Sequence, residues 1–185
     1  NYILSSMDKK KLQFKEALDN AKSLGYAETN PSSDLNGDDV ASKLKILSSL
    51  SFNTFINNKN ISVEGINEID QTDINNANLL GYKIKLLGIA EYNNKKITQR
   101  VHPCLVSKMS YIGKINDVLN AVIVESTPLG RTVLQGPGAG AGPTCSALVS
   151  DLCSILRGNI KFPFVVSYKE RKMLSFEDIT NKLFS

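Results

Sequence analysis

The spacing of hydrophobic positions predicts helices in the first part of the chain and strands in the second. Apolar residues recur every three or four positions over residues 12–24 and 38–50, which is the spacing of one face of an α-helix, and a shorter helix over 72–80 is indicated by the stop signal at Gly81. Residues 26–37 are rich in Pro, Gly, Asn, Asp and Ser, a composition typical of a loop. The chain is therefore predicted to open with helices joined by polar connections.

Apolar and polar residues alternate over residues 82–92, which is the pattern of a β-strand with one buried face. Lys83 and Lys85 fall on the polar face of this strand. An Asn-Asn pair then marks a turn, and residues 95–101 return as a second strand. The pattern therefore predicts a β-hairpin.

Residues 118–124 are apolar on both faces, which predicts a strand at the centre of the sheet, covered on both sides. A further strand is expected over 131–135, a glycine-rich loop over 136–143 and a helix over 144–157. This order of elements predicts an α+β fold, with a mixed, mostly antiparallel sheet and helices packed on one face.

Composition narrows the class of protein. Of the 185 residues, 42% are hydrophobic and 22% charged, which is ordinary for a globular domain and excludes a disordered chain. The apolar runs fall far short of the roughly 20 residues that span a bilayer, so we expect no membrane partner. The net charge is 22 − 18 = +4 and the lysines are scattered, so we expect no nucleic-acid partner.

The cysteines do not form a metal-binding pattern. Cys104, Cys145 and Cys153 include no Cys-x-x-Cys pair, and the single histidine, His102, cannot complete a zinc set. We therefore expect no metal. Reduced, mostly buried thiols in a cytoplasmic protein are the expected state.

The helix predicted over residues 38–50 carries a charged pair. Asp39 and Lys43 lie four residues apart and so share a face, next to the expected core stripe of Val40, Leu44 and Leu47. One interpretation is a surface ion pair worth roughly 0.2–0.5 kcal/mol. The other is a half-buried lysine that Asp39 holds charged, ready to give or take a proton.

Two more carboxylates, Glu28 and Asp34, precede Lys43 in the acidic loop. If they converge with Asp39 at the start of the helix, the three could bind an ammonium group. Asp34 could instead bond its own loop backbone, as aspartates in turns often do.

The glycine-rich loop over 136–143 leads directly into a predicted helix. Glycines let backbone N–H groups approach a ligand, and a helix N-terminus favours negative charge. No Gly-Lys-Ser/Thr follows, so the loop is not of the Walker A type, and a tight strand-to-helix turn is the alternative. No Gly-x-Gly-x-x-Gly follows an early strand, so a complete Rossmann domain is not expected.

Several motifs occur together in one order along the chain. They are Asn1-Tyr2-Ile3-Leu4, Leu24-Gly25-Tyr26-Ala27-Glu28-x-x-Pro31, Asp34-x-Asn36-Gly37-x-Asp39-x-Ala41-x-Lys43-Leu44-x-Ile46-Leu47, Gly65-Ile66, Leu80-Gly81-Tyr82-x-Ile84-Lys85, Val101-His102-Pro103, Asn120-Ala121-Val122 and Gly136-Pro137-Gly138-Ala139-Gly140. Over about residues 1–157, this series resembles the homoserine dehydrogenase family.

The resemblance implies an enzyme that interconverts aspartate semialdehyde and homoserine with NADP or NAD, in threonine and methionine biosynthesis. Residues 1–157 would be its catalytic domain, which binds the small-molecule substrate and forms a homodimer. Residues 158–185 would be a C-terminal extension or linker. The cell compartment implied is the cytoplasm.

The resemblance also implies roles for single residues. Lys43 matches the family's catalytic lysine, the proton donor to the reduced carbonyl oxygen. The residues that match the acidic substrate-site positions are Glu28, Asp39 and Asp34, of which the first two would hold homoserine. Gly140, with Gly138, matches the loop that lies against the cofactor.

Two positions depart from the family pattern: Asn30 stands where Asp is frequent, and Cys104 where Thr is usual. A nucleotide-binding domain is expected to precede Asn1, so this chain alone would carry half an active site and be inactive. The alternatives are a non-catalytic oligomerisation or binding module of the same fold, and a segment of a fused aspartokinase–homoserine dehydrogenase.

Overall fold

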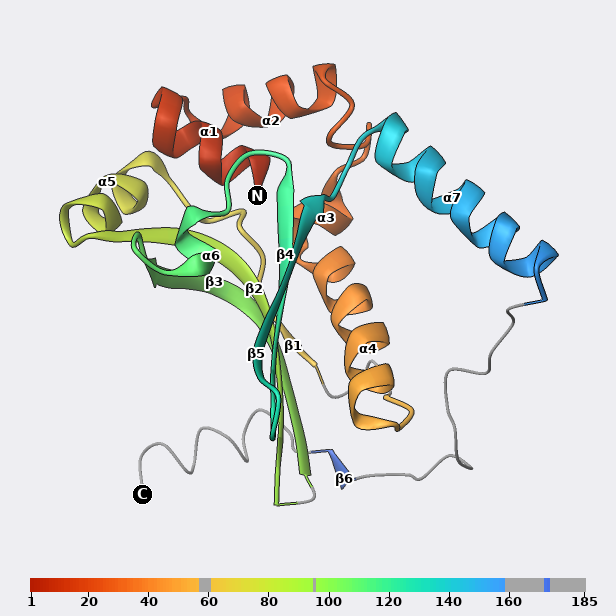
Figure 1. Cartoon of the computed structure of the whole chain (residues 1–185). Coiled ribbons are helices and arrows are strands. Elements are labelled where there is room, and N and C mark those ends of the chain that lie inside the picture. The colour runs from red at the N-terminus through yellow and green to blue at the C-terminus, as the bar shows by residue number, and fades with distance from the viewer. Residues whose placement is uncertain (57–60, 95, 159–171, 174–185) are drawn as a thin grey trace. The chain divides into compact units, whose positions relative to one another are not determined.

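The computed structural model describes residues 1–56, 61–94, 96–158 and 172–173 (Figure 1). The chain divides into two compact units. The first comprises Asn1–Asn30, Ile69–Lys85 and Leu105–Ile160, and the second Pro31–Glu68, Leu86–Cys104 and Lys161–Ser185. Helices and strands occur together with mixed and antiparallel pairing, so the predicted α+β class is confirmed.

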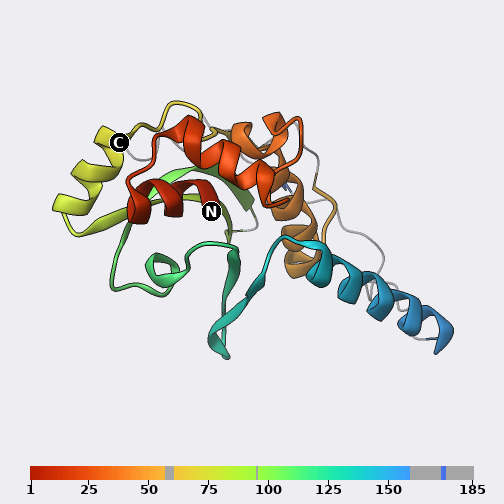
Figure 2. The same ribbon diagram turned by 90° about the horizontal axis from the view of Figure 1, so that it is seen from above.

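In the first unit, helices α1 (Tyr2–Lys10) and α2 (Phe14–Ser23) pack against each other, side by side in Figure 2. The helix predicted over 12–24 is confirmed as α2, which begins with a capping box between Gln13 and Glu16. α1 is an additional helix. It is held to the unit by its buried apolar residues, Ile3, Leu4 and Met7.

Helix α5 (Gln71–Leu79) also packs against α1. It begins at the N-cap Asp70 and ends before Gly81, whose φ of 81° is the left-handed conformation that stops a helix. Polar contacts join these elements to the next strand. The Asp8 carboxylate accepts a hydrogen bond from Asn78 and pairs with Lys83 at 3.5 Å.

Strands β4 (Leu119–Ser126) and β5 (Gly130–Pro137) form a two-stranded antiparallel sheet. The strand expected at 118–124 exists, but its predicted central place is wrong, because β4 pairs with β5 alone among the described strands and none of its residues is buried. Apolar residues on both faces indicate an apolar environment, but they do not identify the element that covers each face.

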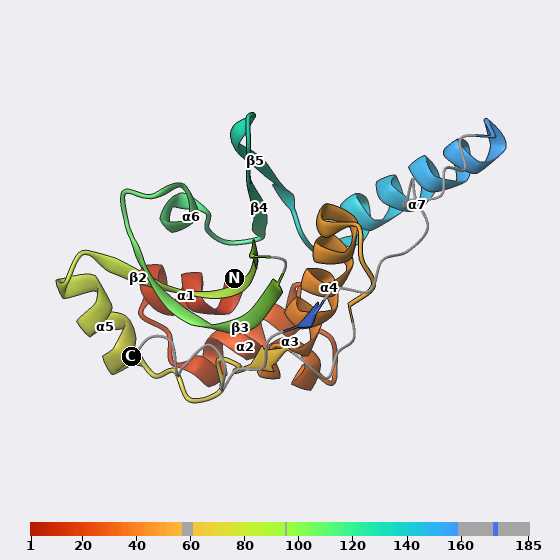
Figure 3. The same ribbon diagram turned by 90° about the horizontal axis from the view of Figure 1, so that it is seen from below.

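Helices α6 (Tyr111–Lys114) and α7 (Ala141–Leu156) precede and follow this strand pair. α7 confirms the helix predicted over 144–157 and begins three residues earlier. It extends away from β4 and β5 in every ribbon view (Figure 1, Figure 2 and Figure 3), and none of its residues is buried. Its exposed large apolar residues are Leu148, Val149, Leu152, Ile155 and Leu156.

The second unit contains helices α3 (Ser32–Asn36) and α4 (Asp38–Phe52) and the short strands β1 (Ser62–Val63) and β6 (Lys172–Met173). α3 corrects the prediction that residues 26–37 form only a loop. Serine and aspartate in its first turn suit a helix start as well as a turn, so composition alone could not separate the two.

The long strands β2 (Tyr82–Asn93) and β3 (Lys96–Ser107) confirm the predicted hairpin and run through both units. The sheet order is β1-β3-β2, and β6 also pairs with β3. β1 and β6 both run parallel to β3. The strands therefore form a mixed sheet and a separate antiparallel pair, where the sequence pattern suggested a single sheet.

Helix α4 packs on β2 through Val40 and Leu44. A Cβ added to Gly88 of β2 would lie 3.1 Å from Val40 and 3.4 Å from Leu44. Leu47, the third residue of the predicted core stripe, is 41% exposed, so that prediction is wrong. Ser48 is buried instead, because its hydroxyl donates to the Leu44 carbonyl oxygen at 2.6 Å and is satisfied inside the helix.

Lys85 also differs from its predicted place. The alternating pattern puts it on the polar face of β2, yet only 5% of the residue is exposed. Its ammonium donates hydrogen bonds to the Asn1 side chain and to the Ile115 carbonyl oxygen. Neighbouring polar acceptors therefore allow a charged residue to be buried where the sequence pattern indicates solvent.

Gly65 provides a test of the packing in the second unit. A Cβ at Gly65 would lie 2.1 Å from the Leu35 carbonyl oxygen and 2.6 Å from Asn36 Cα, and backbone atoms cannot rotate away. We expect Gly65→Ala to lower the free energy of unfolding by about 1–3 kcal/mol, the usual effect of overpacking. Urea unfolding followed by circular dichroism measures this change.

Gly136→Ala is the matched control, since a Cβ at Gly136 meets nothing within 4 Å. It should change the free energy of unfolding by less than about 0.5 kcal/mol. Equal effects of the two substitutions would contradict the close backbone approach at Gly65.

Candidate functional site

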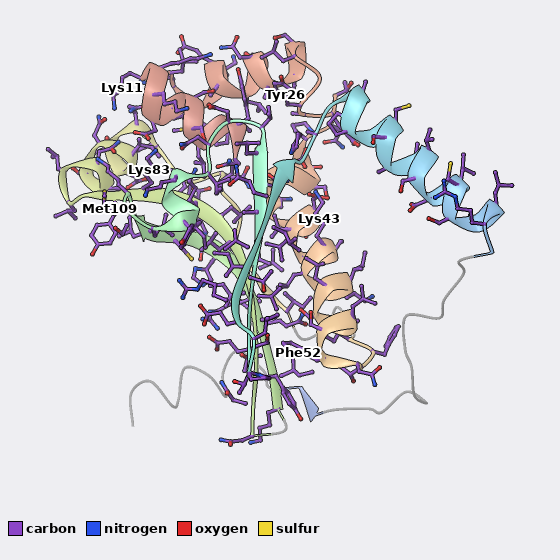
Figure 4. The ribbon with its side chains drawn as sticks, viewed as in Figure 1. Lys11, Tyr26, Lys43, Phe52, Lys83 and Met109 are labelled. Carbon is purple, nitrogen blue, oxygen red and sulfur yellow. The ribbon has the colours of Figure 1, made fainter. Side chains whose placement is uncertain are left out.

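The charged pair predicted on the second helix is present at the first turns of α4. Lys43 Nζ lies 2.6 Å from Asp39 Oδ2, and the two side chains are 57% and 39% exposed. Figure 4 shows Lys43 on the side of α4. Of the two interpretations, the solvent-exposed ion pair is found and the half-buried lysine is not.

The start of α4 depends on a glycine. Gly37, its N-cap, has a φ of 89°, and a Cβ there would lie 3.1 Å from Val63 and 3.3 Å from Val101. Only glycine adopts this conformation easily and fits this close to two strands. The carboxylate of Asp39 then lies in the first helical turn, where the helix dipole favours negative charge.

Asp34 lies in α3, which packs directly against α4. Asp34 is exposed, and its place in a substrate site stays a prediction. The neighbouring residue Asn36 accepts a hydrogen bond from the Asn67 side chain at 2.8 Å, which fixes the end of α3. The structure therefore brings Asp34, Asp39 and Lys43 into one unit.

Glu28 belongs to the other unit, in the connection that follows α2. Gly25, with a φ of 72°, ends that helix, and the Tyr26 ring packs on Tyr2 with centroids 5.1 Å apart. These contacts determine the path of the chain up to Glu28, whose side chain is exposed. The convergence of Glu28 on Lys43 stays a prediction.

The glycine-rich loop connects β5 to α7 in the first unit, and its glycines are required for different reasons. A Cβ at Gly138 would lie 1.8 Å from the Asn120 side chain, so the backbone approaches that side chain too closely for any other residue without a shift. Gly140 is the N-cap of α7 and has a φ of 111°, a conformation that side chains disfavour. The structure shows a strand-to-helix turn at this loop, and its approach to a ligand stays a prediction.

The Asn120 side chain packs beside this loop, which the hydropathy pattern did not indicate. It is a polar residue within the apolar run of β4, and its side chain occupies the space beside Gly138. The Gly138 N–H also donates to the Val118 carbonyl oxygen at 2.9 Å. A polar residue that interrupts an apolar strand was the signal available in the sequence.

His102 and Cys104 lie side by side on β3, with Cys104 Sγ 3.3 Å from His102 Nδ1. Burial raises the pKa of the Cys104 thiol, and nearby Arg100 opposes this only partly, so the thiol is a poor nucleophile at neutral pH. The prediction of mostly buried thiols is wrong, because Cys145 is exposed and Cys104 and Cys153 are partly exposed.

Neither a metal site nor a membrane span is found in the described part of the chain. Within residues 1–56, 61–94 and 96–158, no three His, Cys, Asp or Glu side chains are grouped so that they could hold a metal ion. None of the helices described there is both long and apolar enough to cross a bilayer.

Comparisons with known proteins agree on one family. A family model described as homoserine dehydrogenase matches residues 1–153. The homoserine dehydrogenase of Synechocystis sp. is 44% identical over 160 residues, which cover 84% of this chain and 37% of that protein. The chain spans about two fifths of the length of the curated relatives it matches.

Solved structures give the same result. A homoserine dehydrogenase from Thiobacillus denitrificans is similar with a TM-score of 0.84 and 37% identity, over 95% of this chain and 43% of that chain. A hyperthermophilic archaeal homoserine dehydrogenase, solved in complex with NADPH, is similar with a TM-score of 0.67 and 25% identity, over 89% of this chain and 46% of that chain.

Exposure of the Asp39–Lys43 pair predicts that it contributes little to stability. Asp39→Asn should lower the free energy of unfolding by no more than about 0.5 kcal/mol beyond the effect of Asp38→Asn. Asp38→Asn is the matched control, because it removes a charge from the same helical turn and leaves the pair in place. Thermal unfolding of both variants at low and high salt measures the difference; a loss of several kcal/mol that salt does not reduce would contradict an exposed pair.

Proposed function

Because the chain belongs to the homoserine dehydrogenase family, we propose that it is the substrate-binding part of an NAD(P)-dependent enzyme that interconverts aspartate semialdehyde and homoserine. The observation that carries this proposal is the Lys43–Asp39 pair, 2.6 Å apart at the first turns of α4. An ammonium held by a carboxylate in solvent contact can exchange protons with water and with a ligand.

Lys43 is the proposed proton donor. Reduction of the aldehyde carbon leaves negative charge on the carbonyl oxygen, and a positioned ammonium stabilises that charge and donates a proton to it. Asp39 orients the ammonium along one face of α4. In the reverse direction, Lys43 accepts the proton of the homoserine hydroxyl.

Carboxylates are proposed to hold the other end of the substrate. Homoserine and aspartate semialdehyde each carry an α-ammonium group, which carboxylate oxygens bind through charge-assisted hydrogen bonds. Asp39 and Glu28 supply these oxygens, and Asp34, on the helix packed against α4, lines the site. A cluster of acidic side chains also favours an amino acid over a simple aldehyde.

The loop of Gly138 and Gly140 is proposed to lie against the cofactor, NADP or NAD. Gly140 supports this role because no atom lies closer than 3.8 Å to the place that a Cβ would take there, so the backbone at this position can be approached closely. When bound, the nicotinamide cofactor supplies or accepts the hydride. A relative of this chain was solved with NADPH, which supports the choice of cofactor class.

A cytoplasmic homodimer is proposed as the assembly, with residues 1–157 as the catalytic domain and residues 158–185 as an extension or linker. The β4–β5 pair supports dimerisation, because it carries apolar residues on both strands and none is buried within the described part of the chain. Val124 and Leu134 are 37% and 60% exposed.

Substitution of the proton donor tests the proposed reaction. In the full-length protein that contains this sequence, Lys43→Ala should lower kcat by roughly 10²–10⁴-fold, the usual contribution of general acid catalysis. Lys45→Ala is the matched control: Lys45 lies on the same helix, 5.4 Å from the centre of the Phe55 ring, and should leave kcat within about twofold. Steady-state kinetics with aspartate semialdehyde measure both; a Lys43→Ala enzyme with the control's kcat would reject the role.

Glu28 has a different expected signature. If Glu28 holds the ammonium of the substrate in both the ground state and the transition state, Glu28→Ala should raise the KM for homoserine by about tenfold or more and change kcat much less. Measurement of kcat and KM in the homoserine-oxidising direction separates the two effects. A fall in kcat without a change in KM would contradict a binding role.

A further inference from the structure

The buried Lys85 is not part of the proposed chemistry, yet its hydrogen bonds lead to the glycine loop. Its ammonium, on a residue 5% exposed, lies 2.8 Å from Asn1 Oδ1 and also donates to the Ile115 carbonyl oxygen. Both acceptors are neutral. A buried cation that is held by neutral acceptors orients those acceptors strongly, because loss of either bond leaves charge unsatisfied.

Asn1 passes this constraint to β4. The carboxamide of Asn1 accepts from Lys85 through Oδ1, and its Nδ2 donates to the Leu119 carbonyl oxygen at 2.8 Å. A single side chain therefore joins the ammonium of β2 to the first residue of β4. The orientation of the amide is determined by these two bonds, since Oδ1 cannot donate and Nδ2 cannot accept.

The segment that leads into β4 is held from a second side by α1. The Asp117 N–H donates to Ser5 Oγ at 3.1 Å, and the Asp117 carboxylate pairs with Lys9 at 2.6 Å. Ile115, which accepts from Lys85, lies two residues before Asp117. Ile115, Asp117 and Leu119 are thus each held by a hydrogen bond to a side chain. Their partners are Lys85, Ser5 and Asn1, respectively.

The first residues of β4 in turn hold the glycine loop. The Val118 carbonyl oxygen accepts from the Gly138 N–H at 2.9 Å, Leu119 pairs with Pro137, and the Asn120 side chain fills the space beside Gly138. A displacement of residues 118–120 would therefore move Gly138 directly. All of these contacts lie within the first unit.

We propose that Lys85 is a positioning residue: through Asn1 it holds the start of β4, and thereby sets the conformation of the Gly138–Gly140 loop and its affinity for the cofactor. The part that concerns affinity rests on the proposed function of this loop. Lys85 touches neither substrate nor cofactor in this proposal. It acts through the Asn1 carboxamide and the backbone of β4.

The protonation of Lys85 gives the positioning a dependence on pH. Its pKa is lowered from 10.5 to about 8, mainly by burial and also by the nearby ammonium groups of Lys83 and Lys9, while the carboxylates of Asp8 and Asp117 oppose the shift. Above this pKa the neutral amine donates weaker hydrogen bonds to Asn1 and Ile115. The loop should therefore loosen as the pH rises through about 8 in the wild-type protein.

The test compares Lys85→Met with Lys83→Met in the full-length protein that contains this sequence. Lys83, labelled in Figure 4, lies two residues earlier on β2 and bonds Asn116 and Asp8, not Asn1, so it is matched in strand and charge. Lys85→Met should reduce the hydrogen-exchange protection of the Gly138 amide by about tenfold and raise the Kd for NADPH by about tenfold, the effect of one lost charge-assisted hydrogen bond. Lys83→Met should change each by less than about twofold.

Two further variants distinguish an effect carried by the hydrogen bonds from Lys85 through Asn1 to β4, here called the relay, from a general loss of stability. Asn1→Asp keeps an acceptor for Lys85 and removes the donor to Leu119, so it should loosen Gly138 as much as Lys85→Met does. A double variant of Asn1→Ala and Lys85→Met, which introduces no new charge, should be no worse than either of its single variants, because both break the same chain of bonds. The rise of the NADPH Kd should occur near pH 8 in the wild type, should move to higher pH in Lys83→Met because a neighbouring positive charge is lost, and should be absent in Lys85→Met.

The outcomes separate this inference from the proposed function. Equal loosening by Lys85→Met and Lys83→Met, or strictly additive effects of Asn1→Ala and Lys85→Met, would overturn the positioning role. Should Lys85→Met fail to fold, Asn1→Asp still decides the question, and full protection of Gly138 in that variant would overturn the role. If Gly140→Ala leaves the NADPH Kd unchanged, the proposed function of the loop is rejected, whereas exchange at Gly138 still supports or rejects the relay.

Discussion

The backbone pairing of β2 with β3 positions side chains that hold α4 and the segment that leads into β4. Strand β2 presents Gly88 to α4, and β3 pairs with β1 and β6. Earlier in β2, Lys83 bonds Asp8 of α1 and Asn116, and Lys85 bonds Asn1 and Ile115. Hydrogen bonds along such a ladder are satisfied without any side chain, so its side chains are free to hold neighbouring elements.

Local signals explain what the sequence could predict. The apolar spacing of α4, the alternation along β2 and the glycines that end α2 and α5 are properties of a few adjacent residues, and each element was found where expected. The Asp39–Lys43 pair follows from helical spacing alone, whatever packs nearby.

What the sequence could not predict depends on distant partners. Ser48 is buried because its hydroxyl bonds Leu44, and Leu47 is exposed although it is apolar. Residues 118–124 are apolar on both faces, yet only β5 pairs with them among the described strands. In each case hydropathy reports how a residue interacts with water, while burial depends on which groups the fold places beside it.

The glycines show why one residue type has several structural roles. Gly37 needs both a left-handed backbone and space beside two valines, whereas Gly140 needs only the backbone conformation, since a Cβ there would meet nothing closer than 3.8 Å. Gly138 needs only space, beside Asn120. The family resemblance assigns both Gly138 and Gly140 to the cofactor loop. In the structure, each position requires glycine for a different physical reason.

The lysine with the lowered pKa and the lysine proposed as proton donor are different residues of this chain. A lowered pKa in a buried lysine is a common sign of a catalytic residue, and among the described lysines such a large shift occurs at Lys85. Its ammonium is nevertheless enclosed by Asn1 and Ile115, with 5% of the residue exposed, so no substrate carbonyl can reach it. Lys43 has the access to solvent that proton transfer to a ligand requires. Access therefore supports the proposed role of Lys43 in the chemistry, and the shift at Lys85 reflects the desolvation of a charge that is proposed to hold β4 in place.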